Sequence, residues 1–239
     1  MQLLNILNIK GTITLKSGLH IGAGDVEMHI GGTDNPIIKH PNTQEPYIPG
    51  SSIKGKVRSL LELKSGLVVK TDGNPLSARL LKGLKGEERQ ECETILKLFG
   101  SSGADGEAVA ELGPSRVSFA DCPITKNWQE KVRQSRWSLT EVKSENSINR
   151  IKGTAENPRF TERVPSDTEF AFSVCLKVLK PEEEQPLLEA LLQGLKLLEL
   201  DALGGSGSRG YGKVQFRFED ESIQKRFESI DLFSRGGKL

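Results

Sequence analysis

The stretch from residue 168 to residue 220 constrains the fold of this chain more than any other. Residues 168–179, "TEFAFSVCLKVL", alternate apolar and polar side chains and predict a strand. Residues 181–200, "PEEEQPLLEALLQGLKLLEL", place leucines at helical spacing behind an acidic first turn and predict a helix. Residues 212–220, "GKVQFRFED", alternate again. The chain therefore contains a strand–helix–strand unit, with Cys175 expected in the core.

The N-terminal part supplies the matching half. Residues 3–16 predict a strand, residues 52–64 predict a helix capped by Ser51 or Ser52, and residues 115–124 predict a further strand. The resulting order is strand, helix, strand, strand, helix, strand. This order is the α+β, ferredoxin-like arrangement shared with RRM domains. A last short helix is predicted over 222–230.

Two segments interrupt that order. Residues 64–114 are interpreted as a helical insertion, with short helices at "LSARLLKGL" and "EERQECETILKLFG" and a mobile loop at 100–113. Residues from about 135 to 166 are polar and weakly periodic, which favours a projecting hairpin over a core element. We expect residues 1–239 to form a single domain.

Charge and cysteine content exclude several classes of protein. With 33 Lys and Arg against 32 Asp and Glu, the formal net charge is only +1, so a site for a polyanion must be a local patch. The three cysteines are scattered, which argues against a disulfide framework and a structural zinc site. No leader or membrane-spanning run is visible, and we expect a cytoplasmic protein with no membrane partner.

Two glycine motifs fail as nucleotide sites. "GSSIKGK" at 50–56 fits a P-loop, but Val57 follows where Ser or Thr must bind magnesium. An anion site at this helix start and an ordinary surface helix both stay open. "GSGSRG" at 205–210 fits a dinucleotide motif, but a helix precedes it and a strand follows. Glycines there let backbone approach a ligand, and Arg209 offers a fork for phosphate; the alternative is a helix cap with a tight turn.

Four stretches together carry a family resemblance. They are "LHIGAGD" at 19–25, "IGGTDNPIIKHPNTQEPYIPGSSIKGKVRSLLE" at 30–62, "INRIKGTAENPRFTERVPSDTEF" at 148–170 and the glycine-rich loop 203–212 within "LGGSGSRGYGKVQF". The chain resembles the RAMP superfamily, and within it the backbone subunit of type III-A CRISPR (Csm) interference complexes, the third subunit of that assembly. The resemblance spans most of the chain, and it identifies the predicted hairpin as the family's thumb.

The resemblance implies an RNA-guided function. Copies of such a subunit stack along one CRISPR guide RNA and cleave the paired target RNA at regular intervals, as a metal-dependent endoribonuclease. Implied partners are guide RNA, target RNA, further copies of the chain, the large polymerase-like Cas subunit, the small subunit and the two other RAMP subunits. Two alternatives stay open: a non-catalytic structural RNA-binding subunit, and a guide-processing nuclease that uses a histidine as base.

The resemblance also implies site residues. The cleavage residue falls on Asp34, which would bind Mg²⁺ or Mn²⁺ weakly, with substrate phosphate completing the site; the alternative is an Asx-turn residue before Asn35 and Pro36. His29 and His40 flank it, and His29 is a minor candidate for acid–base work. The residues expected to contact RNA are His20, Lys54, Arg58, Arg150, Arg159, Gly205, Gly207, Ser208, Arg209 and Tyr211, of which Tyr211 could stack or pack.

Overall fold

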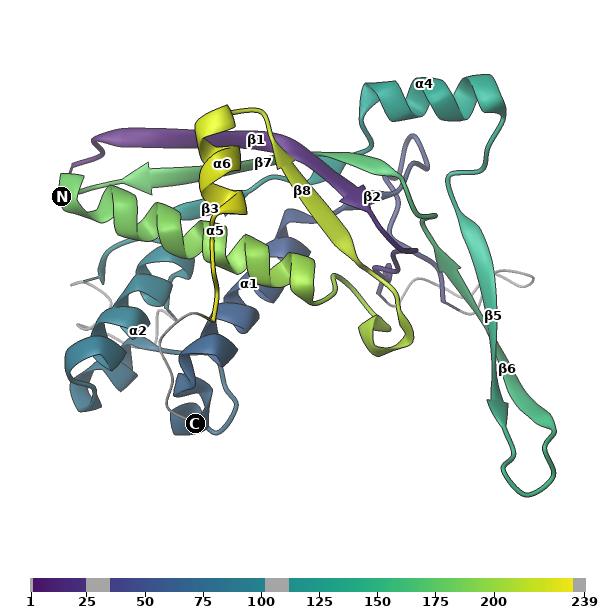
Figure 1. Cartoon of the computed structure of the whole chain (residues 1–239), viewed down its shortest axis with the longest axis horizontal. Coiled ribbons are helices and arrows are strands. Elements are labelled where there is room, and N and C mark those ends of the chain that lie inside the picture. The colour runs from purple at the N-terminus through teal and green to yellow at the C-terminus, as the bar shows by residue number, and fades with distance from the viewer. Residues whose placement is uncertain (1, 25–34, 102–111, 234–239) are drawn as a thin grey trace.

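A computed structural model describes residues 2–24, 35–101 and 112–233. Its centre is a four-stranded antiparallel sheet in the order β3-β7-β1-β8 (Figure 1). The strands are β1 (Asn5–Leu15), β3 (Val117–Phe119), β7 (Glu169–Val178) and β8 (Val214–Phe218). Helix α1 (Gly50–Ser65) connects the first pair and α5 (Glu184–Leu200) the second. This confirms the predicted α+β, ferredoxin-like core.

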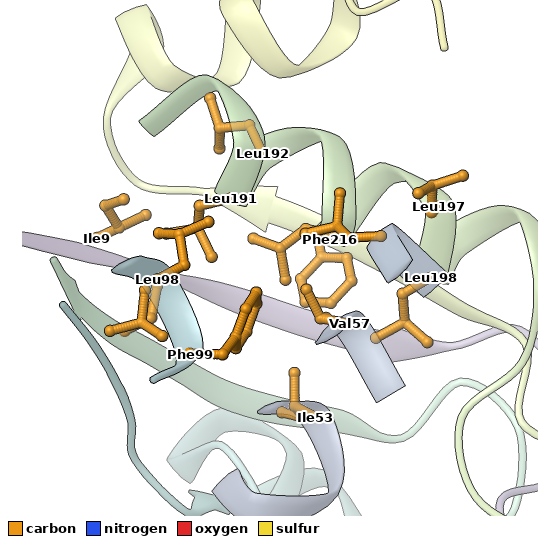
Figure 2. Packing of buried hydrophobic residues seen from close by; sticks show 14 of the residues in the cluster. Ile9, Ile53, Val57, Leu98, Phe99, Leu191, Leu192, Leu197, Leu198 and Phe216 are labelled. Atoms are coloured by element: carbon orange, nitrogen blue, oxygen red, sulfur yellow. The ribbon is translucent and has the colours of Figure 1, made fainter. Parts of the chain in front are cut away.

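One face of the sheet carries the core. Alternate side chains of the strands are buried there, among them Ile13 and Phe172. Figure 2 shows Ile9 and Phe216 in the same core. Phe172 and Phe216 meet edge to face, with ring centroids 5.2 Å apart. The expectation that Cys175 is a core residue is wrong: the even-numbered residues of β7 are buried, so Cys175 points to the opposite, partly exposed face.

Helices α1 and α5 lie together under the core face (Figure 1). Helix α1 follows the predicted span, but its N-cap is Pro49, and Ser51 and Ser52 lie inside its first turn without capping it. Two short segments follow, η1 (Leu67–Thr71) and η2 (Ala78–Gly83), and then α2 (Gly86–Phe99). Helix α2 packs on α1 and α5 with Cys92 and Ile95 buried, so this part of the predicted insertion contributes to the core.

Several smaller elements complete the chain. Strand β2 (Tyr47–Ile48) pairs with β4 (Cys122–Pro123), η4 (Pro181–Glu183) precedes α5, and η5 (Gly207–Arg209) lies in the glycine-rich loop. Helix α6 (Glu221–Glu228) matches the predicted last helix. The mobile loop predicted at 100–113 falls mostly outside the described residues. None of the helices in the described ranges is long and apolar enough to cross a bilayer.

The predicted thumb is a projecting hairpin of β5 (Glu141–Ile148) and β6 (Ala155–Arg163) (Figure 1). It follows α4 (Lys126–Ser135), a helix that the sequence analysis missed. Helix α4 buries no residue completely, and its sequence contains only two apolar residues, Trp128 and Val132, which are too few to reveal a helical period. The thumb and α4 stand at the same end of the sheet.

Two helical glycines provide a matched test of this packing. A Cβ on Gly194 of α5 would lie 2.5 Å from Cγ1 of Val57, whereas a Cβ on Gly55 of α1 would meet nothing within 4 Å. We expect Gly194→Ala to lower the free energy of unfolding by about 1–2 kcal/mol through overpacking. Gly55→Ala should raise it by about 0.4–1 kcal/mol, because alanine restricts the unfolded chain. Urea denaturation measures both, and equal effects would contradict the close α1–α5 contact.

Candidate nucleic-acid interface

A cleft of about 350 Å³ lies between the thumb and the glycine-rich loop, and we call it the thumb–loop cleft. It brings Arg159 of β6 next to Arg209 of η5, two residues that the sequence analysis assigned to RNA. Arg150, at the exposed tip of the thumb, does not line it. The lining residues are Lys143, Glu145, Asn146, Ser147, Asn157, Arg159 and Arg209.

Part of the glycine content serves the packing of the protein itself. A Cβ on Gly204 would lie 2.3 Å from the carbonyl oxygen of His20, and one on Gly212 would lie 1.9 Å from that of Leu203. Both glycines have positive φ, of 73° and 71°. A Cβ on Gly207 would likewise lie only 2.9 Å from the Cβ of Ala202. The alternative of a tight turn therefore accounts for these three positions.

The middle of the same loop offers backbone donors. The N–H of Gly205 donates to the carbonyl of His20 at 2.9 Å and anchors the loop. The next three N–H groups, of Ser206, Gly207 and Ser208, have no acceptor in the part of the chain that the structure describes. Ser206 has a left-handed conformation and η5 begins directly after it. Consecutive free N–H groups in such a turn are typical binders of anions.

Glu145 organises the charges of the cleft. Its carboxylate accepts hydrogen bonds from Nη1 of Arg209 at 2.8 Å and from the hydroxyl of Tyr211 at 3.0 Å, and Lys143 lies 3.2 Å away. Burial alone would raise the pKa of Glu145, but the hydrogen bonds from Lys143 and Tyr211 and the charge of Arg209 lower it. The lining thus contains three cations, Lys143, Arg159 and Arg209, and one carboxylate, and the side chain of Arg209 remains 52% exposed.

Tyr211 packs instead of stacking on a base. Its side chain is fully buried, with Nζ of Lys143 4.5 Å and the guanidinium of Arg163 5.0 Å from its ring centroid. Burial and the neighbouring carboxylate of Glu145 raise the pKa of its hydroxyl. The assignment of Tyr211 to RNA contact is corrected accordingly: it supports the base of the thumb.

Glu162 of β6 connects the thumb to two other segments. Its carbonyl accepts a hydrogen bond from Nδ1 of His20 at 2.7 Å, which orients the imidazole. Its carboxylate accepts from the N–H of Ile37 at 3.1 Å and from Lys39 at 2.5 Å. Burial would raise the pKa of Glu162, but Lys39 and Ile37 lower it. His20 thus lies at the junction of the thumb and the glycine-rich loop.

Asp34 and His29 lie outside the described residues. The residue after Asp34 is described: the carbonyl of Asn35 accepts a hydrogen bond from the N–H of Glu162 at 3.1 Å. Asn35 also forms an isolated parallel β-bridge with Thr161 of β6. The backbone of Asn35 is therefore fixed at the root of the thumb. His40 is exposed and accepts from the N–H groups of Asn42 and Thr43, which makes it part of a turn.

The basic residues of α1 have different environments. Arg58 donates from Nε to Glu62 at 2.7 Å and from Nη2 to the carbonyl of Leu76 at 2.8 Å, and it is largely buried. Its assignment to guide phosphates is therefore corrected to a structural role. Lys56 pairs with Asp201 at 2.6 Å. Lys54 has no ion pair among the described residues, and its phosphate role stays a prediction.

Lys143 is the cleft cation that the sequence analysis missed. It lies on the same face of β5 as Glu145, two residues away, and both are half-buried. The segment "EVKSEN" contains no signal for it, because its one apolar residue, Val142, is exposed, and the period of two appears only in the burial of the folded strand.

The fold and this interface define the class of protein. The model of the RAMP superfamily matches residues 12–215, and the chain belongs to that superfamily. Within it, the chain belongs to the family of the CRISPR endoribonuclease Csm3, as comparison with curated relatives shows.

Two relatives and one solved structure illustrate the similarity. The "CRISPR system Cms endoribonuclease Csm3" of Methanothermobacter thermautotrophicus is 40% identical over 224 residues, covering 87% of this chain and 82% of the relative. The protein of the same name in Mycobacterium tuberculosis is 39% identical over 223 residues, covering 88% and 86%. A crystal structure of the Csm3-Csm4 subcomplex of a type III-A CRISPR-Cas interference complex matches with a TM-score of 0.55 and 25% identity, over 99% and 100% of the chains.

The ion pair at Glu162 predicts a specific dependence of stability on pH. Because the pKa of Glu162 in the folded protein lies below its ordinary value of 4.5, its charged contacts stabilise the fold above that pH and are lost as the pH falls through the folded pKa. We expect Glu162→Gln to lower the free energy of unfolding by about 1.5–3 kcal/mol near neutral pH. The difference in free energy of unfolding between the variant and wild type should become smaller in acid. Denaturant melts between neutral pH and acid measure this.

The exposed Glu219 offers a matched control for that experiment. Glu219→Gln should change stability little at any pH, because surface substitutions are usually within about 0.5 kcal/mol. A Glu162→Gln deficit that persisted unchanged in acid would contradict the role of the Glu162 charge.

Proposed function

We propose that this chain is a backbone subunit of a CRISPR RNA-guided type III-A effector complex, where it holds the guide RNA by its backbone and cleaves the paired target RNA. The observation that carries the proposal is the thumb–loop cleft, which brings together Lys143, Arg159 and Arg209. The loop that contributes Arg209 also carries consecutive N–H groups with no acceptor among the described residues. Such donors bind phosphates and read no bases, which suits guides of any sequence. The endoribonuclease names of the relatives support cleavage.

In this proposal, Asp34 is the catalytic residue. RNA carries its own nucleophile, so the protein must mainly hold the 2′-oxygen in line with the adjacent phosphorus. The bond from the 2′-oxygen to phosphorus forms as the bond to the 5′-oxygen breaks. The proton lost from the 2′-hydroxyl is matched by one gained at the 5′-oxygen, which leaves a cyclic phosphate and a 5′-hydroxyl. The anchored backbone of Asn35, the next residue along the chain, supports a reaction site near the root of the thumb.

We also propose a requirement for a divalent metal ion. Among the described residues, no three His, Cys, Asp or Glu side chains are grouped so that they could hold a metal. In this proposal Asp34 would be the protein ligand, and phosphate and water oxygens would complete the site. Mg²⁺ or Mn²⁺ bound there would stabilise the charge that develops on the phosphoryl oxygens.

The proposed partners follow from this role. The chain would stack with further copies of itself along the guide and join the large polymerase-like Cas subunit, the small subunit and the two other RAMP subunits. A Csm3-Csm4 subcomplex exists for a protein of similar fold, which supports contact with another Csm subunit. The chain would act in the cytoplasm as part of a ribonucleoprotein.

The catalytic proposal is tested by Asp34→Asn in the assembled complex. We expect target cleavage to fall at least about 10²-fold, because the reacting geometry or charge stabilisation is lost. Binding of target RNA should be unchanged. Gel analysis of end-labelled target RNA measures both. Asp72→Asn, a change of the same type at an exposed surface residue, should cleave normally.

Two outcomes would decide against this assignment. Unchanged cleavage by Asp34→Asn would favour a structural RNA-binding subunit. Cutting of a guide precursor by the purified chain without metal would favour the guide-processing alternative, in which a histidine is the base.

The binding proposal is tested by replacing the cleft arginines. We expect Arg209→Ala and Arg159→Ala each to reduce the guide RNA that copurifies with the complex. Each should make the dependence of RNA affinity on salt less steep. The negative slope of log K, the association constant, against log salt concentration should shrink in magnitude by about 0.7, the value for one phosphate contact to a single strand. Lys225→Ala removes one exposed charge from α6 and should change neither quantity. Equal losses in all three variants would show that the cleft is not the guide site.

A further inference from the structure

A second cleft lies where α4 meets the connection between β6 and β7, and we call it the tryptophan cleft. Its volume is about 520 Å³, within the range of about 300–1,000 Å³ that is usual for ligand sites. It shares no residue with the thumb–loop cleft. Its lining residues are Trp128, Lys131, Val132, Trp137, Ser138, Pro165, Ser166, Asp167 and Thr168.

Two indole rings dominate this cleft. The ring centroids of Trp128 and Trp137 are 6.1 Å apart, and their planes are inclined by 47°. Trp128 packs partly against the core, but Trp137 is 56% exposed. They are the two tryptophans of the whole chain. An exposed indole of this size is costly in water, and such surfaces commonly mark a binding site.

The backbone fixes Trp137 in place. Arg136 is the C-cap of helix α4, directly after its last residue, and it has a left-handed conformation with φ of 55°. The N–H of Trp137 then donates to the carbonyl of Val132 at 3.1 Å. At the other end, Thr125 caps the helix through the N–H of Trp128. Both tryptophans are therefore attached to capped ends of one short helix, and the cleft between them is preformed.

The charge of this helix favours a polyanion. From Lys126 to Arg136 the exposed charged residues are four cations, namely Lys126, Lys131, Arg133 and Arg136, and one acid, Glu130. Their net charge of +3 exceeds the +1 of the entire chain. Nζ of Lys131 lies 5.4 Å from the centroid of Trp128, at the mouth of the cleft. Asp167 is the one acidic residue in the lining.

We propose that the tryptophan cleft binds an unpaired nucleotide of single-stranded RNA. The base stacks on the exposed indole of Trp137, and the adjoining phosphates are held by Lys131 and the other cations of α4. Aromatic platforms interleaved with cations are the common means of binding single strands without reading their sequence. The site does not depend on the thumb–loop cleft, and it adds a second point at which RNA contacts the subunit.

The two tryptophans make the test specific, because all tryptophan emission of the chain comes from this cleft. We expect a single-stranded uridine decamer to quench that emission in the full-length chain. The Trp128→Phe variant, which emits from Trp137 alone, should still be quenched. Trp137→Ala should weaken binding of the labelled decamer at least about fivefold, as the loss of one stacked base predicts. Phe233→Ala, at another exposed aromatic residue, should bind normally.

Further variants separate this proposal from the proposed function. The double variant Arg159→Ala, Arg209→Ala should keep the quench, because these residues are not part of the tryptophan cleft. Trp137→Phe keeps an aromatic ring and should restore part of the affinity that Trp137→Ala loses. An unquenched Trp128→Phe chain that still binds the decamer would overturn the proposal. A change of emission with protein concentration alone would also overturn it, since the cleft would then bind a second copy of the chain.

Discussion

The hydrogen bonds of Glu162 hold the parts of the interface together. Its carboxylate is buried, and burying a charge is costly unless it is paired. Lys39 and the N–H of Ile37 provide the partners, while the backbone of the same residue bonds to His20 and Asn35. One position of β6 therefore fixes the segment after Asp34, the imidazole of His20 and the root of the thumb relative to one another.

The thumb–loop cleft is organised by a carboxylate in a different way. In the free chain, Glu145 holds the guanidinium of Arg209 and the ammonium of Lys143 in position. A phosphate that binds Arg209 competes with this carboxylate, because both are anionic acceptors for the same fork. In the proposed complex, RNA binding would thus be an exchange of partners for Arg209. Each contact then contributes less than it would from an unpaired arginine, while the arginine is already ordered before RNA arrives.

Much of the fold could be predicted, because apolar periods of two and 3.6 identify buried faces directly from residues such as Phe170, Phe172 and Phe216. Helix α4 could not be found in this way, since it buries no residue completely. The ion pair of Arg58 could have been predicted, although the sequence analysis assigned this residue to RNA, because Glu62 follows it at the spacing of a helical ion pair. The partners of Glu162 could not be predicted, because Ile37 lies 125 residues away in the sequence and the pairing exists only in the folded chain.

The small net charge of the chain also bears on how it holds RNA. Cations exceed acidic residues locally at the thumb–loop cleft and along α4, whereas positive and negative charges nearly balance over the whole chain. A single subunit can therefore offer only a few contacts to a nucleic acid, and its affinity alone should be modest. Copies stacked on one strand would convert later contacts into intramolecular ones, at a high effective concentration. Binding would then depend on assembly, and a lone subunit would release RNA easily.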